Sequence, residues 1–259
     1  MEKVLFCFAL SMDRWLASQE LFSDEQNIPS KQHSVSFVMR RRIKEIYQRL
    51  FTQYGAQSWW PAKTRFEVIV GAILTQNTNW TNVEKAIENL RRARLLNPSA
   101  LKNIPVDNLS RLIRPAGYFN VKARRLKNFV EFLFKEYNGQ LKRMSQEPVG
   151  KLRPRLLSVN GIGEETADSI LLYALDKPVF VVDAYTKRFL SRHRLIEEDA
   201  DYQEVQNEFT RALPKDIQLF NEYHALIVRL GKEFCKTKAL CEICPLKDVH
   251  YSMEWREGW

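Results

Sequence analysis

The residues best suited to chemistry begin with a glycine-rich turn in the second half of the 259-residue chain. Gly161-Ile162-Gly163 separates two stretches of helical character, and two acidic residues follow it. Glycine tolerates positive φ angles and lets the backbone approach a partner closely. A tight turn that leads into a helix also leaves amide N–H groups without partners, and these groups can bind a phosphate. The turn alone is equally compatible with an ordinary corner between two helices.

Asp183 is the second candidate, and it stands twenty residues after Gly163. It follows the apolar run Val179-Phe180-Val181-Val182 and precedes a basic segment of helical character. Aspartate is a favoured residue at a helix N-cap. A single residue can cap a helix and also carry chemistry, so a capping role does not remove Asp183 from consideration.

Together these two elements resemble the signature of a known family. Gly161-Ile162-Gly163 followed by Thr166-Ala167, and then Val182-Asp183, is similar to the helix-hairpin-helix plus Gly/Pro-Asp signature of endonuclease III-like DNA glycosylases. The resemblance covers roughly residues 39–250. It implies that Gly161, Ile162, Gly163 and Thr166 bind phosphates of double-stranded DNA that contains a damaged base. It also implies that Asp183 is the catalytic carboxylate, which stabilises positive charge on the sugar and orients or deprotonates a water molecule.

One departure from the family pattern concerns the nucleophile. Bifunctional members carry a lysine two residues after the second hairpin glycine, and this chain has Glu165 there. A carboxylate cannot form the Schiff base that leads to strand cleavage. The resemblance therefore implies a monofunctional glycosylase with water as the nucleophile and without AP-lyase activity. We expect Glu164 and Glu165 to stabilise the positive end of the second hairpin helix.

Three further stretches are similar to the 3-methyladenine glycosylase branch of the family. They are Trp59-Trp60-Pro61, residues 74–78 and residues 114–123. The resemblance implies that a flipped alkylated purine is held against Trp59 or Trp60 and that Gln76 fills the space left by the base. The tryptophans are also compatible with a hydrophobic plug between domains, and Gln76 with a polar residue at a helix end. Other functions left open are excision of oxidised pyrimidines or mismatched bases, and DNA binding without catalysis.

Three cysteines near the C-terminus have the spacing of metal ligands. They form the pattern Cys235-x5-Cys241-x2-Cys244, and His250 lies six residues further on. Endonuclease III relatives carry a 4Fe-4S cluster on a similar loop of four cysteines, so the resemblance implies such a cluster here. Zinc bound by three cysteines and one histidine, or no metal at all, are the alternatives.

Composition supports a polyanionic partner. The chain has 40 Lys and Arg against 31 Asp and Glu, a net charge of +9, which favours nucleic acid over the other candidate, an anionic membrane surface. Lys187, in the basic segment after Asp183, is expected to contact DNA. No apolar run approaches the ~20 residues needed to cross a bilayer. Cysteines clustered as metal ligands suggest an intracellular protein, and we expect it to be a monomer.

The elements that must position these residues are helices. Apolar residues recur at helical spacing, as at Ile43, Ile46, Tyr47 and Leu50, and only 179–182 has the character of a strand. The sequence therefore predicts an all-α fold of two helical domains with a helix-hairpin-helix and a C-terminal cysteine-rich metal loop. The predicted parts are a poorly ordered extension at 1–38, a helical barrel at 57–177 that ends in the hairpin, and a second domain formed by 39–56 plus 178–259.

Overall fold

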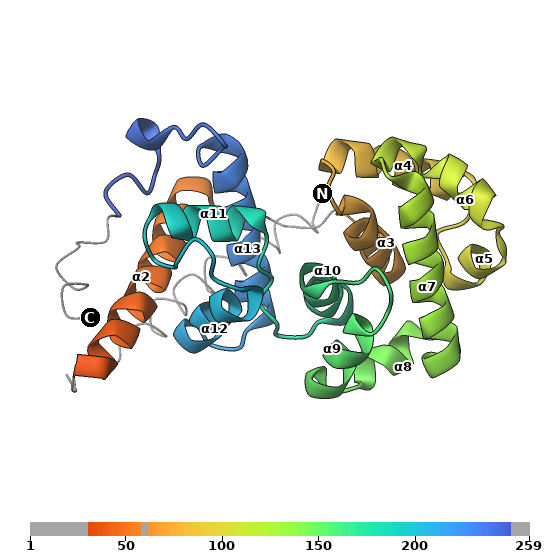
Figure 1. Ribbon diagram of the computed structural model, residues 1–259, viewed down its shortest axis with the longest axis horizontal. Helices are drawn as coiled ribbons and strands as arrows, with labels where there is room; N and C mark the ends of the chain where they lie inside the picture. Colours follow the sequence, from red (N-terminus) through yellow and green to blue (C-terminus); the bar gives the residue numbers. More distant parts are fainter. Residues whose placement is uncertain (1–30, 58–61, 250–259) are drawn as a thin grey trace, which may run out of the picture. The chain divides into compact units, whose positions relative to one another are not determined.

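The computed structural model describes residues 31–57 and 62–249, and this part of the chain is helical (Figure 1). It contains no strand, which confirms the predicted all-α class. The run Val179–Val182 is a buried irregular segment. Among the described helices, none is long and apolar enough to cross a membrane. The elements are α2 (Lys31–Tyr54), α3 (Arg65–Thr75), α4 (Trp80–Arg92), α5 (Pro98–Asn103), α6 (Val106–Leu112), η1 (Arg114–Ala116), α7 (Phe119–Tyr137), α8 (Leu141–Gln146), α9 (Val149–Leu157), α10 (Glu164–Ser169), η2 (Ile170–Ala174), α11 (Ala184–Arg192), α12 (Tyr202–Ala212), α13 (Ile217–Glu233) and η3 (Cys241–Ile243).

The chain divides into two compact units, each assembled from separate segments. Asp183 is the last residue of the long segment of unit 2, whereas we expected it in the domain formed by residues 39–56 and 178–259. The chain later returns to unit 2 with a short segment that ends at His224. Unit 1 takes the described parts of Met1–Gln57, Ala184–Pro214 and Ala225–Trp259, and unit 2 those of Ser58–Asp183 and Lys215–His224.

Unit 2 is built around α3, a helix that is buried almost all round. An apolar helix of this kind belongs in the middle of a domain. It contacts α4, α7 and α10, and α7 is covered in turn by α5 and α6 (Figure 1). Large apolar side chains recur at helical spacing along α7 and are buried: Leu126, Phe129, Val130 and Leu133.

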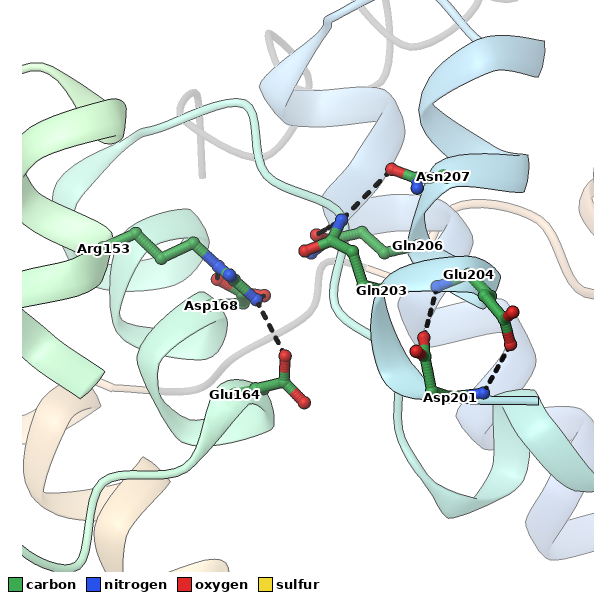
Figure 2. A network of polar contacts seen from close by, with 8 residues as sticks. All are labelled: Arg153, Glu164, Asp168, Asp201, Gln203, Glu204, Gln206 and Asn207. Carbon is green, nitrogen blue, oxygen red and sulfur yellow. Dashed lines mark hydrogen bonds and ion pairs between the residues drawn. The ribbon is translucent and has the colours of Figure 1, made fainter. Parts of the chain in front are cut away.

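Unit 1 contains α2, which packs against α12. The predicted stripe of α2 is buried, with Ile43, Ile46 and Leu50 fully covered. A capping box closes the start of α12, where Asp201 accepts from the amide of Glu204 at 2.7 Å and Glu204 accepts from the amide of Asp201 at 2.8 Å (Figure 2). This closure satisfies two amides that have no partner within the helix.

Helix α2 begins earlier than the sequence led us to expect. The predicted extension ran to residue 38, but the helix starts at Lys31. No proline or glycine lies between Pro29 and the helical stripe, so nothing in the local sequence stops the helix from continuing toward the N-terminus.

Candidate active site

The predicted hairpin is present, with α9 and α10 joined by the turn at residues 158–163. Gly161 has a φ of +93°, in the region that L-residues rarely adopt, and a Cβ added there would lie 2.3 Å from Cγ of Arg125. This position therefore requires glycine. Gly163, by contrast, has a φ of −89° and nothing within 4 Å of an added Cβ. Its backbone is exposed, and the space beside it is open to a partner.

A set of side-chain hydrogen bonds braces the hairpin from outside. Gln76 Nε2 donates to the carbonyl of Gly161 at 3.0 Å and to Thr166 Oγ1 at 2.9 Å. Arg125 donates to Gln76 Oε1. Asn128 donates to the carbonyl of Asn160 at 3.0 Å. The structure thus brings together two residues predicted at the DNA surface, Gln76 and Thr166, but it ties both into the hairpin.

Ile162 and Thr166 are buried, with 4% and 6% of their surfaces exposed. These two side chains hold the turn in place, which leaves the backbone of the turn as the part that can reach a phosphate. No side chain caps the N-terminus of α10. The amides of its first turn therefore have no partner within the helix.

Arginine and aspartate join the two hairpin helices (Figure 2). Arg153 of α9 makes a bidentate pair with the fully buried Asp168 of α10, at 2.7 and 3.0 Å. Glu164 lies 3.6 Å from the same guanidinium. A bidentate pair fixes orientation as well as distance, so α9 and α10 are held at a set angle. Glu164 therefore has a partner of its own in addition to its place in the first turn of α10.

A buried lysine fixes the segment that carries Gln76. Lys122 is 1% exposed and donates to the carbonyls of Leu74 at 2.9 Å and Ala116 at 2.7 Å. Burial, with the nearby charge of Arg125, lowers the pKa of Lys122 to about 8. One ammonium group therefore joins the end of α3 to η1.

Asp183 belongs to a compact polar group of unit 2. The residue is 9% exposed, and its Oδ2 lies 3.5 Å from Nε2 of His224. Nδ1 of His224 lies 2.5 Å from the hydroxyl of Tyr173. Tyr173 is in η2, the π-helical segment that continues α10. Such segments often occur at functional sites.

Glu165 interacts electrostatically with Asp183 and His224 of this polar group. The surrounding protein, and then the negative charge of Asp183, raise the pKa of Glu165 to about 7, while His224 acts in the opposite direction. The side chain of Glu165 still reaches the solvent, which screens part of this effect. The position that holds the amine nucleophile in bifunctional relatives thus carries an acid near the candidate catalytic carboxylate.

The basic residues of α11 bind carbonyl groups of unit 1. Lys187 donates to the carbonyl of Ala200 at 2.7 Å. Arg188 donates to the carbonyl of Cys235 at 2.8 Å, and Arg192 to those of Lys236 and Thr237 at 2.5 and 2.8 Å. Arg188 and Arg192 therefore fasten the start of the cysteine loop, and Lys187, which we expected at DNA, has a partner within the protein.

The three cysteines lie on that loop. Cys235 is buried, Cys244 is half-buried and Cys241 is exposed. The sulfur of Cys235 accepts from Arg192 at 3.4 Å, and that of Cys244 from the amide of Leu246 at 3.5 Å. Across residues 31–57 and 62–249, no three or more histidine, cysteine or acidic side chains are grouped so as to hold a metal ion. The described residues therefore do not by themselves form a metal site, and His250, the predicted fourth ligand, lies outside them.

The predicted base pocket also lies outside the described residues, because Trp59, Trp60 and Pro61 are not among them. Two residues of the site escaped the sequence prediction, Tyr173 and His224. The available signal was a histidine within the apolar stripe of α13, between Tyr223 and Leu226. That signal is weak, since a buried histidine in a helix usually has only a structural role.

Comparisons with known proteins identify the family of this chain. Residues 70–215 match the model of the HhH-GPD superfamily of base excision DNA repair proteins, which is more than half of the chain. A Methanocaldococcus jannaschii protein assigned provisionally as a DNA repair glycosylase is 54% identical over 208 residues, covering 80% of this chain and 94% of that protein. Similar solved structures include an H. pylori 3-methyladenine DNA glycosylase bound to 1,N6-ethenoadenine, with 31% identity, a TM-score of 0.63 and coverage of 76% of this chain and 97% of the other.

The fold is also that of endonuclease III in a non-covalent complex with DNA, with a TM-score of 0.71, 22% identity and coverage of 84% and 96% of the two chains. The chain therefore belongs to the helix-hairpin-helix Gly/Pro-Asp superfamily of base excision DNA repair proteins. Within this superfamily it is a DNA glycosylase of the endonuclease III-like type.

Proposed function

We propose that this protein is a monofunctional glycosylase that hydrolyses the N-glycosidic bond of alkylated purines such as 3-methyladenine in double-stranded DNA. The observation that carries the proposal is Glu165, an acid where strand-cleaving relatives need an amine. The 31% identity to a 3-methyladenine glycosylase supports the substrate class.

In the proposed mechanism, the hairpin holds the DNA backbone and Asp183 does the chemistry. As the bond between the base and C1′ breaks, its electron pair leaves with the base. Positive charge develops on the sugar, and the nearby carboxylate stabilises it. Water attacks C1′, and its proton passes to the carboxylate. A base alkylated at N3 is cationic before the reaction and leaves as a neutral molecule, so one carboxylate is sufficient.

The catalytic assignment is tested by Asp183→Asn. This change removes the charge and keeps the size of the side chain, so excision of methylated bases should fall by about 100-fold or more. Binding of the same duplex, measured by fluorescence anisotropy, should change little, because the hairpin is untouched. Excision at the wild-type rate by a correctly folded Asp183→Asn protein would show that another residue carries the reaction.

Spacing and resemblance also lead us to propose a structural 4Fe-4S cluster held by Cys235, Cys241, Cys244 and His250. Elemental analysis of the purified protein tests this prediction. Iron with acid-labile sulfide is the expected result, and Cys241→Ala should lower the iron content. Zinc without iron, or neither metal, would contradict the cluster. The hydrogen bonds of Arg188 and Arg192 would then be the contacts that hold the loop.

A further inference from the structure

We propose that His224 is a positioning residue that holds the carboxylate of Asp183 ionised and oriented, and that Tyr173 fixes His224 in the tautomer this requires. This inference rests on the proposed catalytic role of Asp183 and adds two residues to it. Both lie in unit 2 with Asp183, although His224 reaches it on a separate segment of the chain.

The tautomer follows from what each partner can donate. Burial and the charges of Asp183 and Glu165 raise the pKa of Tyr173 well above its ordinary value, so the phenol keeps its proton. It can therefore donate to Nδ1 of His224, across 2.5 Å, while Nε2 faces a carboxylate that can only accept. The imidazole proton then belongs on Nε2.

Nε2 of His224 points toward the catalytic candidate. It is buried and has no hydrogen-bond partner within the described part of the chain, and Oδ2 of Asp183 is 3.5 Å away. A buried donor without a partner is costly, so a small approach of the carboxylate is favourable. An N–H directed at a carboxylate stabilises its charged form.

This arrangement orients the carboxylate of Asp183 through Oδ2, the oxygen that lies 3.5 Å from Nε2 of His224. His224 itself takes no part in bond breaking, because the proton of the water passes to the carboxylate. The titratable groups that face His224 are Asp183, Tyr173 and Glu165, and the negative form of Glu165 opposes ionisation of Asp183.

Matched substitutions of His224 test the positioning role in excision of methylated bases. Leucine removes the N–H, whereas glutamine can place an amide N–H near the position of Nε2. We expect His224→Leu to lower kcat by at least about tenfold, the effect of one oriented hydrogen bond to a charged group, with little change in KM. The acid limb of the kcat pH profile of His224→Leu should move to higher pH, because the N–H that stabilises the charged form of Asp183 is gone. His224→Gln should recover most of the rate, and equal losses in both variants would overturn the proposal.

A control and a second variant separate positioning from folding. His193→Leu removes a histidine of unit 1 whose Nδ1 contacts the carbonyl of Val249, and the pH profile should stay unchanged. Tyr173→Phe removes only the hydroxyl that selects the tautomer, so kcat should fall less than in His224→Leu. A Tyr173→Phe profile identical to that of the wild type would contradict the role of the hydroxyl.

A measurement without substrate keeps this inference independent of the proposed activity. Nitrogen-15 NMR of the imidazole side chains reports the tautomer of each histidine, and His224→Gln identifies the signals of His224. At neutral pH we expect the Nε2–H tautomer in the wild-type protein and a mixture in Tyr173→Phe. An Nδ1–H tautomer in the wild-type protein would overturn the proposal. Failure to release alkylated bases, with the expected tautomer present, would count against the proposed function alone.

Discussion

Glu165 and Asp183 are two carboxylates that influence each other, and their surroundings give them different properties, since Asp183 is buried and Glu165 reaches the solvent. The surroundings of Glu165 raise its pKa to about 7. Asp183 faces an imidazole N–H that favours its charged form. A pair of acids in unlike environments is a common way to separate a charged group from a protonated one. Here the charged group is the one that the family signature marks as catalytic.

The raised pKa of Glu165 predicts how its replacement changes stability with pH. Between pH 4.5 and about 7 the unfolded state loses the proton of Glu165 while the folded state keeps it. The free energy of unfolding therefore falls over this range, because the folded protein must carry the charge at an unfavourable position once the pH exceeds about 7. Glu165→Gln removes the cost. The variant should match the wild type in melting temperature below pH 4.5 and gain on it as the pH rises through about 7. Differential scanning calorimetry over this range measures the difference.

Glu164→Gln is the matched control, one residue earlier in the same helix turn. It loses an ion pair with Arg153 and should gain no stability at high pH. A Glu165→Gln protein that is no more stable than the wild type at high pH would show that the charge of Glu165 is well tolerated.

At the scale of elements, the hairpin uses its two glycines for different purposes. Gly161 is needed by the fold, because its φ of +93° and the contact with Arg125 leave no room for a side chain. Gly163 has an ordinary φ and open space around it. A glycine that the fold does not require is the natural place for close approach of a partner's backbone.

This difference predicts opposite results for two alanine substitutions. Gly161→Ala should destabilise the protein by about 2 kcal/mol or more, through backbone strain and overpacking. Gly163→Ala should change stability by less than about 0.5 kcal/mol, yet weaken DNA binding, because its methyl group would stand between the backbone and a phosphate. Chemical denaturation and anisotropy titrations measure the two effects. Unchanged DNA affinity in Gly163→Ala would place the phosphate contacts elsewhere.

Secondary-structure elements were predictable where the signal in the sequence is local. The stripe of α2 and the turn at Gly161 follow from periodicity and from glycine chemistry, both of which are visible within a few residues. The start of α2 at Lys31 was missed because the residues between it and the apolar stripe are mostly polar and show no clear helical periodicity. The π-helical segment at Tyr173 was missed because a single change of helical period leaves no mark in the sequence.

The candidate site was predictable only in part, because some of its contacts join residues that lie far apart in the sequence. Asp183 and the hairpin lie close in sequence, and their separation identified both. Gln76 and Gly161 are 85 positions apart, and Tyr173 and His224 are 51 apart, so no local pattern reveals either contact. A lysine that binds DNA and one that binds an internal carbonyl look alike in sequence, and Lys187 illustrates this.

At the scale of the whole molecule, the chain passes through unit 2 twice to assemble the site. The first passage ends at Asp183, and the return segment ends at His224. The net charge of +9 suits a polyanionic partner. Part of that charge is nevertheless used internally, since Lys122, Arg188 and Arg192 bind carbonyl groups. Net charge therefore indicates the class of partner without indicating which residues contact it.

The most direct test of the central claim is base release from methylated DNA by the wild-type protein, with cleavage of an abasic strand followed in parallel. The proposed mechanism predicts release of 3-methyladenine, an intact strand and no covalent product on borohydride treatment, because Glu165 cannot form a Schiff base. No release of the alkylated base would contradict the substrate and direct attention to oxidised or mismatched bases. Release with strand cleavage and a borohydride-trapped complex would contradict hydrolysis by water and mean that an amine elsewhere in the chain is the nucleophile.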